Sequence, residues 1–178
     1  MSRFPSGWFF IQSKCRHKMV LEVFQDSLKA TAKIVVWPMK TKDVDNQLWM
    51  YDHGYIINKN SGMVLDVHGG ILESDKPIIQ YKRKMLEDAQ NQRWYYREDG
   101  VIYPQVDPNL VLDIRGNWDK KGTVVLLYER KYEDNLNQLW DLVPYQQSDS
   151  VSILSSTHTS FTEEEKDEYS FSSATYAL

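Results

Sequence analysis

The residues that could carry out covalent or metal chemistry are few and poorly spaced in this chain of 178 residues. Nucleophilic catalysis, zinc binding and glycoside hydrolysis need a nucleophile beside a base, a cluster of ligands and a pair of carboxylates, respectively. The single cysteine, Cys15, can neither close an internal disulfide nor build a cysteine-based zinc site. The four histidines do not pair at ligand spacing: His17, His53, His68 and His158. There is also no Gly-x-Ser-x-Gly, no glycine-rich phosphate loop and no His-Glu-x-x-His. We therefore predict that the protein is not an enzyme and holds no metal or cofactor.

Acidic, aromatic and amide side chains, in contrast, recur at fixed intervals. Three positions carry an acid, then an aromatic 15 residues later, then an asparagine 9 or 10 residues after that. The sets are Glu22, Trp37 and Asn46; Asp66, Tyr81 and Asn91; and Asp113, Tyr128 and Asn137. The three acids belong to three different sets, which points to separate pockets rather than to one catalytic pair.

The elements that carry these residues form an internal repeat. Each asparagine precedes a Gln-x-Trp tripeptide, and the three tryptophans are 45 and 46 residues apart: Trp49, Trp94 and Trp140. Each acid lies in a short apolar run, namely Val20–Val23, Val64–Val67 and Val111–Ile114. A third series opens each repeat with a glycine before apolar residues: Gly7, Gly54 and Gly100. Three series in one register establish a threefold repeat.

Each repeat predicts four short β-strands. In the second repeat the expected strands are Tyr55–Asn58, Met63–Val67, Pro77–Tyr81 and Arg93–Tyr96. Turn formers separate these runs, and no stretch up to residue 145 sustains a helical apolar period. Twelve short strands at this spacing are typical of an all-β barrel or sandwich.

The three Gln-x-Trp repeats resemble those of the R-type, ricin-B-like lectin family. The resemblance covers about residues 5–145 and implies a β-trefoil of three four-stranded repeats with pseudo-threefold symmetry, at about 5–51, 52–96 and 97–145. In that family the tryptophans form a shared core, so we expect Trp49, Trp94 and Trp140 to be buried.

The resemblance also implies non-catalytic binding of carbohydrate in shallow pockets, one per repeat. The acid would accept hydrogen bonds from sugar hydroxyls, the aromatic would stack on the ring, and the asparagine would complete the polar contacts. A carboxylate beside a flat ring suits a pyranose, which has a hydroxyl-rich edge and a C–H face. The expected ligands are glycans of galactose type, and the expected sites are the three acid–aromatic–asparagine sets, with no metal.

Two departures from the family pattern weaken the comparison at particular positions. Glu22 replaces the family's aspartate in the first repeat, which favours the second and third repeats as working sites. Two residues before each aromatic, where many sugar-binding members have a glutamine, this chain has Val35, Ile79 and Leu126. One alternative is therefore a β-trefoil scaffold that has lost sugar binding and contacts a protein partner through its loops or tail. Another is an accessory module of a longer protein.

The charge distribution restricts the possible partners and distinguishes residues 146–178 from the rest of the chain. Residues 1–145 have a net charge of +1, which disfavours a nucleic-acid partner. Lys40, Lys84 and Lys131, with Arg83 and Arg130, suit sulfated or sialylated glycans or a solvated loop face, of which we favour the latter. Residues 146–178 are rich in serine and threonine, have a net charge of −5 and predict a disordered acidic tail. No apolar run is long enough for a membrane span or a secretory signal, so we expect a cytoplasmic protein.

Overall fold

The computed structural model describes residues 4–146, which form strands and short turns without an α-helix. The twelve strands are β1 (Phe9–Ser13), β2 (Val20–Val23), β3 (Ile34–Trp37), β4 (Trp49–Asp52), β5 (Tyr55–Asn58), β6 (Val64–Val67), β7 (Lys76–Tyr81), β8 (Trp94–Tyr96), β9 (Ile102–Pro104), β10 (Leu110–Ile114), β11 (Val125–Glu129) and β12 (Trp140–Pro144). No helix of the described residues is long and apolar enough to cross a membrane.

The chain divides into a compact unit that ends at Gln146 and a second segment, Gln147–Leu178. The predicted acidic tail at 146–178 lies, apart from Gln146, outside the described residues. Its predicted disorder therefore stays a prediction.

Each repeat contributes four strands, as the sequence predicts. Repeat one holds β1–β4, repeat two β5–β8 and repeat three β9–β12. In repeat two the observed bounds differ from the predicted ones by at most one residue at each end. The all-β fold, a β-trefoil, is confirmed.

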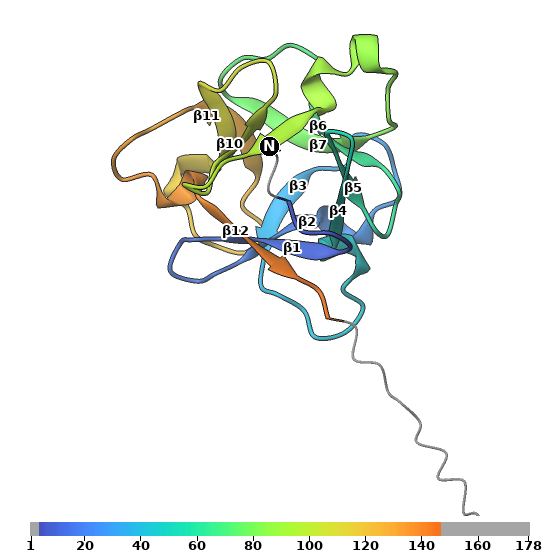
Figure 1. The fold of residues 1–178 in the computed structure, drawn as a ribbon. Helices are drawn as coiled ribbons and strands as arrows, with labels where there is room; N and C mark the ends of the chain where they lie inside the picture. Colours follow the sequence, from blue (N-terminus) through green and yellow to red (C-terminus); the bar gives the residue numbers. More distant parts are fainter. Residues whose placement is uncertain (1–3, 147–178) are drawn as a thin grey trace, which may run out of the picture. The chain divides into compact units, whose positions relative to one another are not determined.

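The strands pair antiparallel in two groups, one made of the first and last strands of the repeats and the other of the two middle strands of each repeat. Strands β12, β1, β4 and β5 pair in that order, and β8 pairs with β9. The other strands form three hairpins, β2–β3, β6–β7 and β10–β11. The hairpins contact one another in a closed cycle through Lys33 and Ile79, Pro77 and Leu126, and Val35 and Val124. Figure 1 shows β1 beside β12, so the first and last strands of the fold are neighbours.

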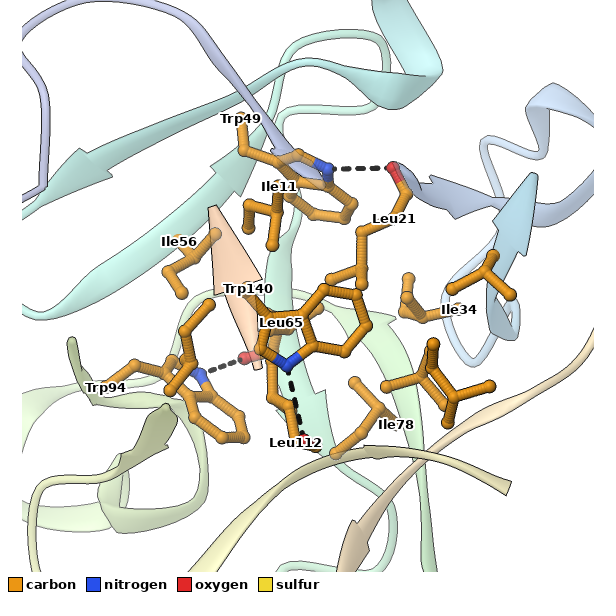
Figure 2. Packing of buried hydrophobic residues seen from close by; sticks show 14 of the residues in the cluster. Ile11, Leu21, Ile34, Trp49, Ile56, Leu65, Ile78, Trp94, Leu112 and Trp140 are labelled. Carbon is orange, nitrogen blue, oxygen red and sulfur yellow. Dashed lines mark hydrogen bonds between the residues drawn. The ribbon is translucent and has the colours of Figure 1, made fainter. Parts of the chain in front are cut away.

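The core is built from the same positions of all three repeats. Trp49, Trp94 and Trp140 are fully buried, as predicted. Each indole Nε1 donates a hydrogen bond to the carbonyl of the leucine that precedes its repeat's acid, namely Leu21, Leu65 and Leu112, at 3.1 to 3.3 Å (Figure 2). A buried indole needs such a partner, and truncating one costs about 3–5 kcal/mol. The Gln-x-Trp tryptophan therefore ties the start of each repeat's last strand to the strand that carries the acid.

Single-turn 3₁₀ segments connect the strands. They are η1 (Phe24–Asp26), η2 (Asp45–Gln47), η3 (Leu86–Asp88), η4 (Gln90–Gln92), η5 (Arg115–Asn117) and η6 (Leu136–Gln138). Three of them, η2, η4 and η6, carry the asparagine and glutamine that precede the core tryptophan. These turns therefore hold two amide side chains in a fixed position against the hairpin of the same repeat.

Candidate functional site

The hairpin of each repeat brings the predicted acid and aromatic to one face. In repeat two, Asp66 on β6 lies directly opposite Ile79 on β7. Tyr81 is two residues beyond Ile79, and alternate residues of a strand share a face. Repeats one and three have the same pairing, with Glu22 opposite Val35 before Trp37, and Asp113 opposite Leu126 before Tyr128. The constant spacing of 15 residues is thus a consequence of hairpin register.

The glutamine of Gln-x-Trp holds the acid, a role that the sequence reasoning missed. Gln92 Nε2 donates to Asp66 Oδ2 at 2.8 Å and to the Lys82 carbonyl at 2.9 Å. Gln92 Oε1 accepts the backbone N–H of Lys84 at 2.9 Å. The same contacts recur from Gln47 to Glu22 and from Gln138 to Asp113, both at 2.8 Å. The signal available in the sequence was the separation of acid and glutamine, which is 25 or 26 residues in every repeat.

The asparagines anchor their turns to the acid-bearing strand. Asn91 Nδ2 donates to the Val67 carbonyl at 3.0 Å, and its Oδ1 accepts from Lys84 Nζ at 2.9 Å. Lys40 makes the same contact with Asn46 in repeat one. Lys40 and Lys84 therefore each hydrogen-bond to the asparagine of their own repeat. A loop face that contacts only solvent, which the sequence analysis favours, does not describe these two lysines.

All three acids are buried, and burial controls their protonation. Glu22, Asp66 and Asp113 are each 3% exposed. Burial raises the pKa of each carboxyl above its ordinary range, because the ionised form loses hydration. The glutamine hydrogen bond and the charge of the nearby lysine oppose this rise. The acids are held by side-chain amides, which leaves each carboxylate only partly saturated by the protein.

Repeats two and three each form a cleft over this acid. The cleft of repeat two has a volume of about 330 Å³. Its lining includes the predicted residues Asp66, Tyr81 and Asn91 together with Ile79, Lys84 and His68. The cleft of repeat three is smaller, about 170 Å³, and includes Asp113, Leu126, Tyr128 and Lys131 in its lining. Ile79 and Leu126, which replace the family's glutamine, thus supply an apolar part of each cleft.

Repeat one differs because other side chains engage its aromatic ring. Trp37 is partly buried, with the Phe24 ring centroid at 6.4 Å and Lys121 Nζ at 5.7 Å from its own. Lys40 Nζ binds Asp26 Oδ1 at 3.0 Å as well as Asn46. The predicted residues Glu22, Trp37 and Asn46 therefore lie together. Neighbouring side chains of the protein already contact Trp37 and Asn46, whereas the aromatic residue of repeat two lines an open cleft.

Metal chemistry gains no support from the geometry. Among residues 4–146, no three His, Cys, Asp or Glu side chains are grouped so as to hold a metal ion. Each acid instead lies in its own hairpin with its own glutamine, which is an arrangement suited to accepting hydrogen bonds from a polar ligand.

Comparison with known proteins agrees with the β-trefoil fold. The family model of the ricin-type beta-trefoil lectin domain matches residues 52–168. Mucoricin from Rhizopus delemar is 46% identical over 100 residues, which cover 56% of this chain and 67% of mucoricin.

Two solved structures show the same fold. The solution structure of the mdaA-1 domain superposes with a TM-score of 0.73 at 32% identity, covering 80% of this chain and 93% of that domain. The C-terminal half of an earthworm R-type lectin, solved in complex with GalNAc, gives a TM-score of 0.65 at 22% identity. That match covers 78% of this chain and 98% of the earthworm one, and at this identity it supports the fold alone.

Proposed function

The chain belongs to the ricin-type β-trefoil lectin family, and on that premise we propose that it is a non-catalytic carbohydrate-binding protein whose working pockets lie in repeats two and three. The observation that carries this proposal is the cleft of repeat two, where Asp66, Tyr81 and Asn91 line one hollow. Sugars of galactose type are the first ligands to test, since GalNAc and lactose occupy two of the structural neighbours.

The mechanism follows from the chemistry of the cleft. The Asp66 carboxylate accepts hydrogen bonds from sugar hydroxyls while Gln92 holds its other side in place. Tyr81, which is 37% exposed, offers its ring to the C–H face of the pyranose. Lys84 donates from the wall of the cleft, and Ile79 supports the apolar face. Asp113 and Tyr128 take the same roles in repeat three.

The test uses variants that change the acid without emptying its position. In Asp66→Asn and Asp113→Asn, the amide oxygen still accepts from the glutamine, but the sugar meets a donor in place of an acceptor. We expect the double variant to lose about 10- to 100-fold in affinity for GalNAc by calorimetry, as for hydrogen bonds to a charged group. Its melting temperature should be unchanged or higher, because an amide is buried at lower cost than a carboxylate.

A charge-matched control separates site chemistry from net charge. Asp88→Asn with Glu133→Gln removes two negative charges at exposed positions and should leave GalNAc affinity unchanged. A well-folded wild-type protein that binds no member of a glycan array would overturn the proposal. The alternative, a scaffold that contacts a protein partner through its loops, would then become the better interpretation, and it draws on the near-complete burial of Asp66 and Asp113. The cytoplasmic location also stays a prediction.

A further inference from the structure

The three repeats share one platform but differ in the residue two positions beyond the acid. That residue is Phe24, His68 or Arg115 in repeats one, two and three. Phe24 packs near Trp37, whereas His68 and Arg115 line the clefts of their repeats. The wall of the pocket is therefore aromatic, imidazole or cationic while the acid and glutamine beneath it stay the same.

Arg115 also extends the cleft of repeat three into a second hollow. This hollow has a volume of about 340 Å³, and Arg115 lines both. Trp118 is 65% exposed beside it, with Lys120 and Lys121 in the same lining. The one acid of this loop, Asp119, is engaged by His17, whose backbone N–H and ring lie 2.7 and 2.8 Å from Asp119 Oδ2. The hollow thus combines an exposed indole face with three cations.

The other repeats do not have this combination. The loop 115–124 has a net charge of +2, against +1 for 24–33 and −1 for 68–77. In repeat two, Ile71 and Glu73 stand at the positions of Trp118 and Lys120. A cationic extension beside the sugar pocket is therefore particular to repeat three.

A fourth cation in repeat three is oriented differently from its counterparts. Lys84 donates to Asn91, but in repeat three Asn137 Oδ1 is buried and has no partner among the described residues. Lys131 Nζ lies 5.9 Å from the centroid of the Tyr128 ring instead. The ammonium group therefore sits by the aromatic residue on which the sugar would stack.

We propose that repeat three binds an acidic oligosaccharide, in which a galactose-type ring bears a sulfate ester or is joined to a sialic acid. This inference rests on the proposed function and names the ligand class of one of its pockets. Asp113 and Tyr128 hold the neutral ring, Arg115 binds the anionic group, and Trp118 stacks on the neighbouring part of the glycan. Guanidinium groups recognise carboxylate and sulfate oxygens with paired donors, and the indole face suits a pyranose.

Asp75 gives the proposal a second test of opposite sign. Its Oδ1 lies 3.3 Å from Arg115 Nη2, and both side chains are at least half exposed. An anionic ligand must compete with Asp75 for this guanidinium, so removing the carboxylate should strengthen binding. Asp75 has a φ of 68°, a conformation that asparagine tolerates, so Asp75→Asn should fold normally.

The experiment compares lactose, 6′-sialyllactose and 3′-sulfated lactose by calorimetry at about 50 mM NaCl, where exposed charges are weakly screened. We expect the wild-type protein to bind each acidic sugar about five- to tenfold more tightly than lactose, a gain appropriate to a partly exposed ion pair. Arg115→Gln should abolish this ratio of the affinity for an acidic sugar to that for lactose. Asp75→Asn should raise the ratio. Lys29→Gln, the equivalent of Lys120 in repeat one, is the matched control and should change nothing.

The outcomes separate this inference from the proposed function. Binding of lactose with a ratio near one overturns the acidic ligand but keeps the lectin. No binding of any sugar by folded protein overturns both. A ratio that survives Arg115→Gln, or inorganic sulfate that binds as tightly as the sulfated sugar, also contradicts a site built from a sugar pocket and Arg115.

Discussion

At the residue scale, the site depends on a carboxylate that is buried but not fully paired. Gln92 fixes Asp66 from beneath, while burial raises the pKa of that carboxyl. The same holds for Gln138 and Asp113. A buried carboxylate with incomplete protein hydrogen bonding costs stability, and a polar ligand offsets part of that cost by supplying the missing donors. Under the proposed function, the acid is thus placed for sugar binding at a cost in the stability of the fold.

The raised pKa values predict opposite pH responses for stability and for sugar binding. Because the pKa values of these carboxyls are higher in the folded state than in the unfolded state, the folded protein binds more protons at any pH between the two pKa values. The contribution of Asp66 and Asp113 to stability is therefore fully present below their unfolded pKa and is lost as the pH rises through the folded one. Sugar hydroxyls, in contrast, need the ionised carboxylate as their acceptor.

We accordingly expect affinity for GalNAc to fall as the pH is lowered from 7 to 4, with a midpoint above the ordinary range of an aspartate. Calorimetry across this range, with melting curves at each pH, measures both responses. The Asp66→Asn and Asp113→Asn double variant should show no such midpoint. An affinity that stays constant to pH 4 in the wild type would mean that these carboxylates are not the acceptors.

At the element scale, the sequence predicts the strands well and the turns poorly. Strands such as Tyr55–Asn58 follow from apolar runs between turn formers, and the structure has this strand with the predicted bounds. The segments η2, η4 and η6 have only three residues each, too few to leave a periodic signal. The contact from Gln92 to Asp66 spans 26 residues and depends on how such a turn docks on its hairpin. The grouping of acid and aromatic on one hairpin could thus be predicted, but the glutamine amide that holds the acid could not.

The glycines that open the repeats have a structural role that only the fold reveals. The carbonyls of Gly54 and Gly100 accept the backbone N–H of Trp94 and Trp140 at 2.8 Å. Both glycines have a φ near 100°. A Cβ on Gly100 would lie 3.1 Å from the carbonyl oxygen of Trp140, whereas a Cβ on Gly7 would contact nothing within 4 Å. The opening glycine therefore matters more for stability in the third repeat than in the first.

We expect Gly100→Ala to lower the free energy of unfolding by about 2–3 kcal/mol, combining backbone strain at positive φ with steric conflict. Gly7→Ala, whose φ of 76° lies in the same half of the map, should cost only about 1 kcal/mol. Urea unfolding followed by tryptophan fluorescence measures both values. Equal losses in the two variants would contradict a specific role for the contact between Gly100 and Trp140.

At the scale of the whole molecule, pseudo-threefold symmetry holds for the core but not for the surface. Trp49, Trp94 and Trp140 make equivalent hydrogen bonds, as the closure of one shared core requires. The cleft walls are free of that requirement, which is why they can differ between repeats. One chain can therefore present pockets of different selectivity on a single rigid platform.

The proposal of two working pockets on one chain predicts avidity for clustered glycans. On a surface densely coated with GalNAc, we expect Asp66→Asn and Asp113→Asn each to weaken apparent binding at least tenfold, because the second binding event is no longer intramolecular. With free GalNAc, each single variant should instead keep the affinity of its remaining site and lose only stoichiometry, from two to one. Surface plasmon resonance at high and low glycan density distinguishes these effects, since the wild type and the variants should converge on the sparse surface. If one single variant matches the wild type within twofold on the dense surface while the other loses binding, only one pocket is at work, and avidity would then require a second copy of the chain.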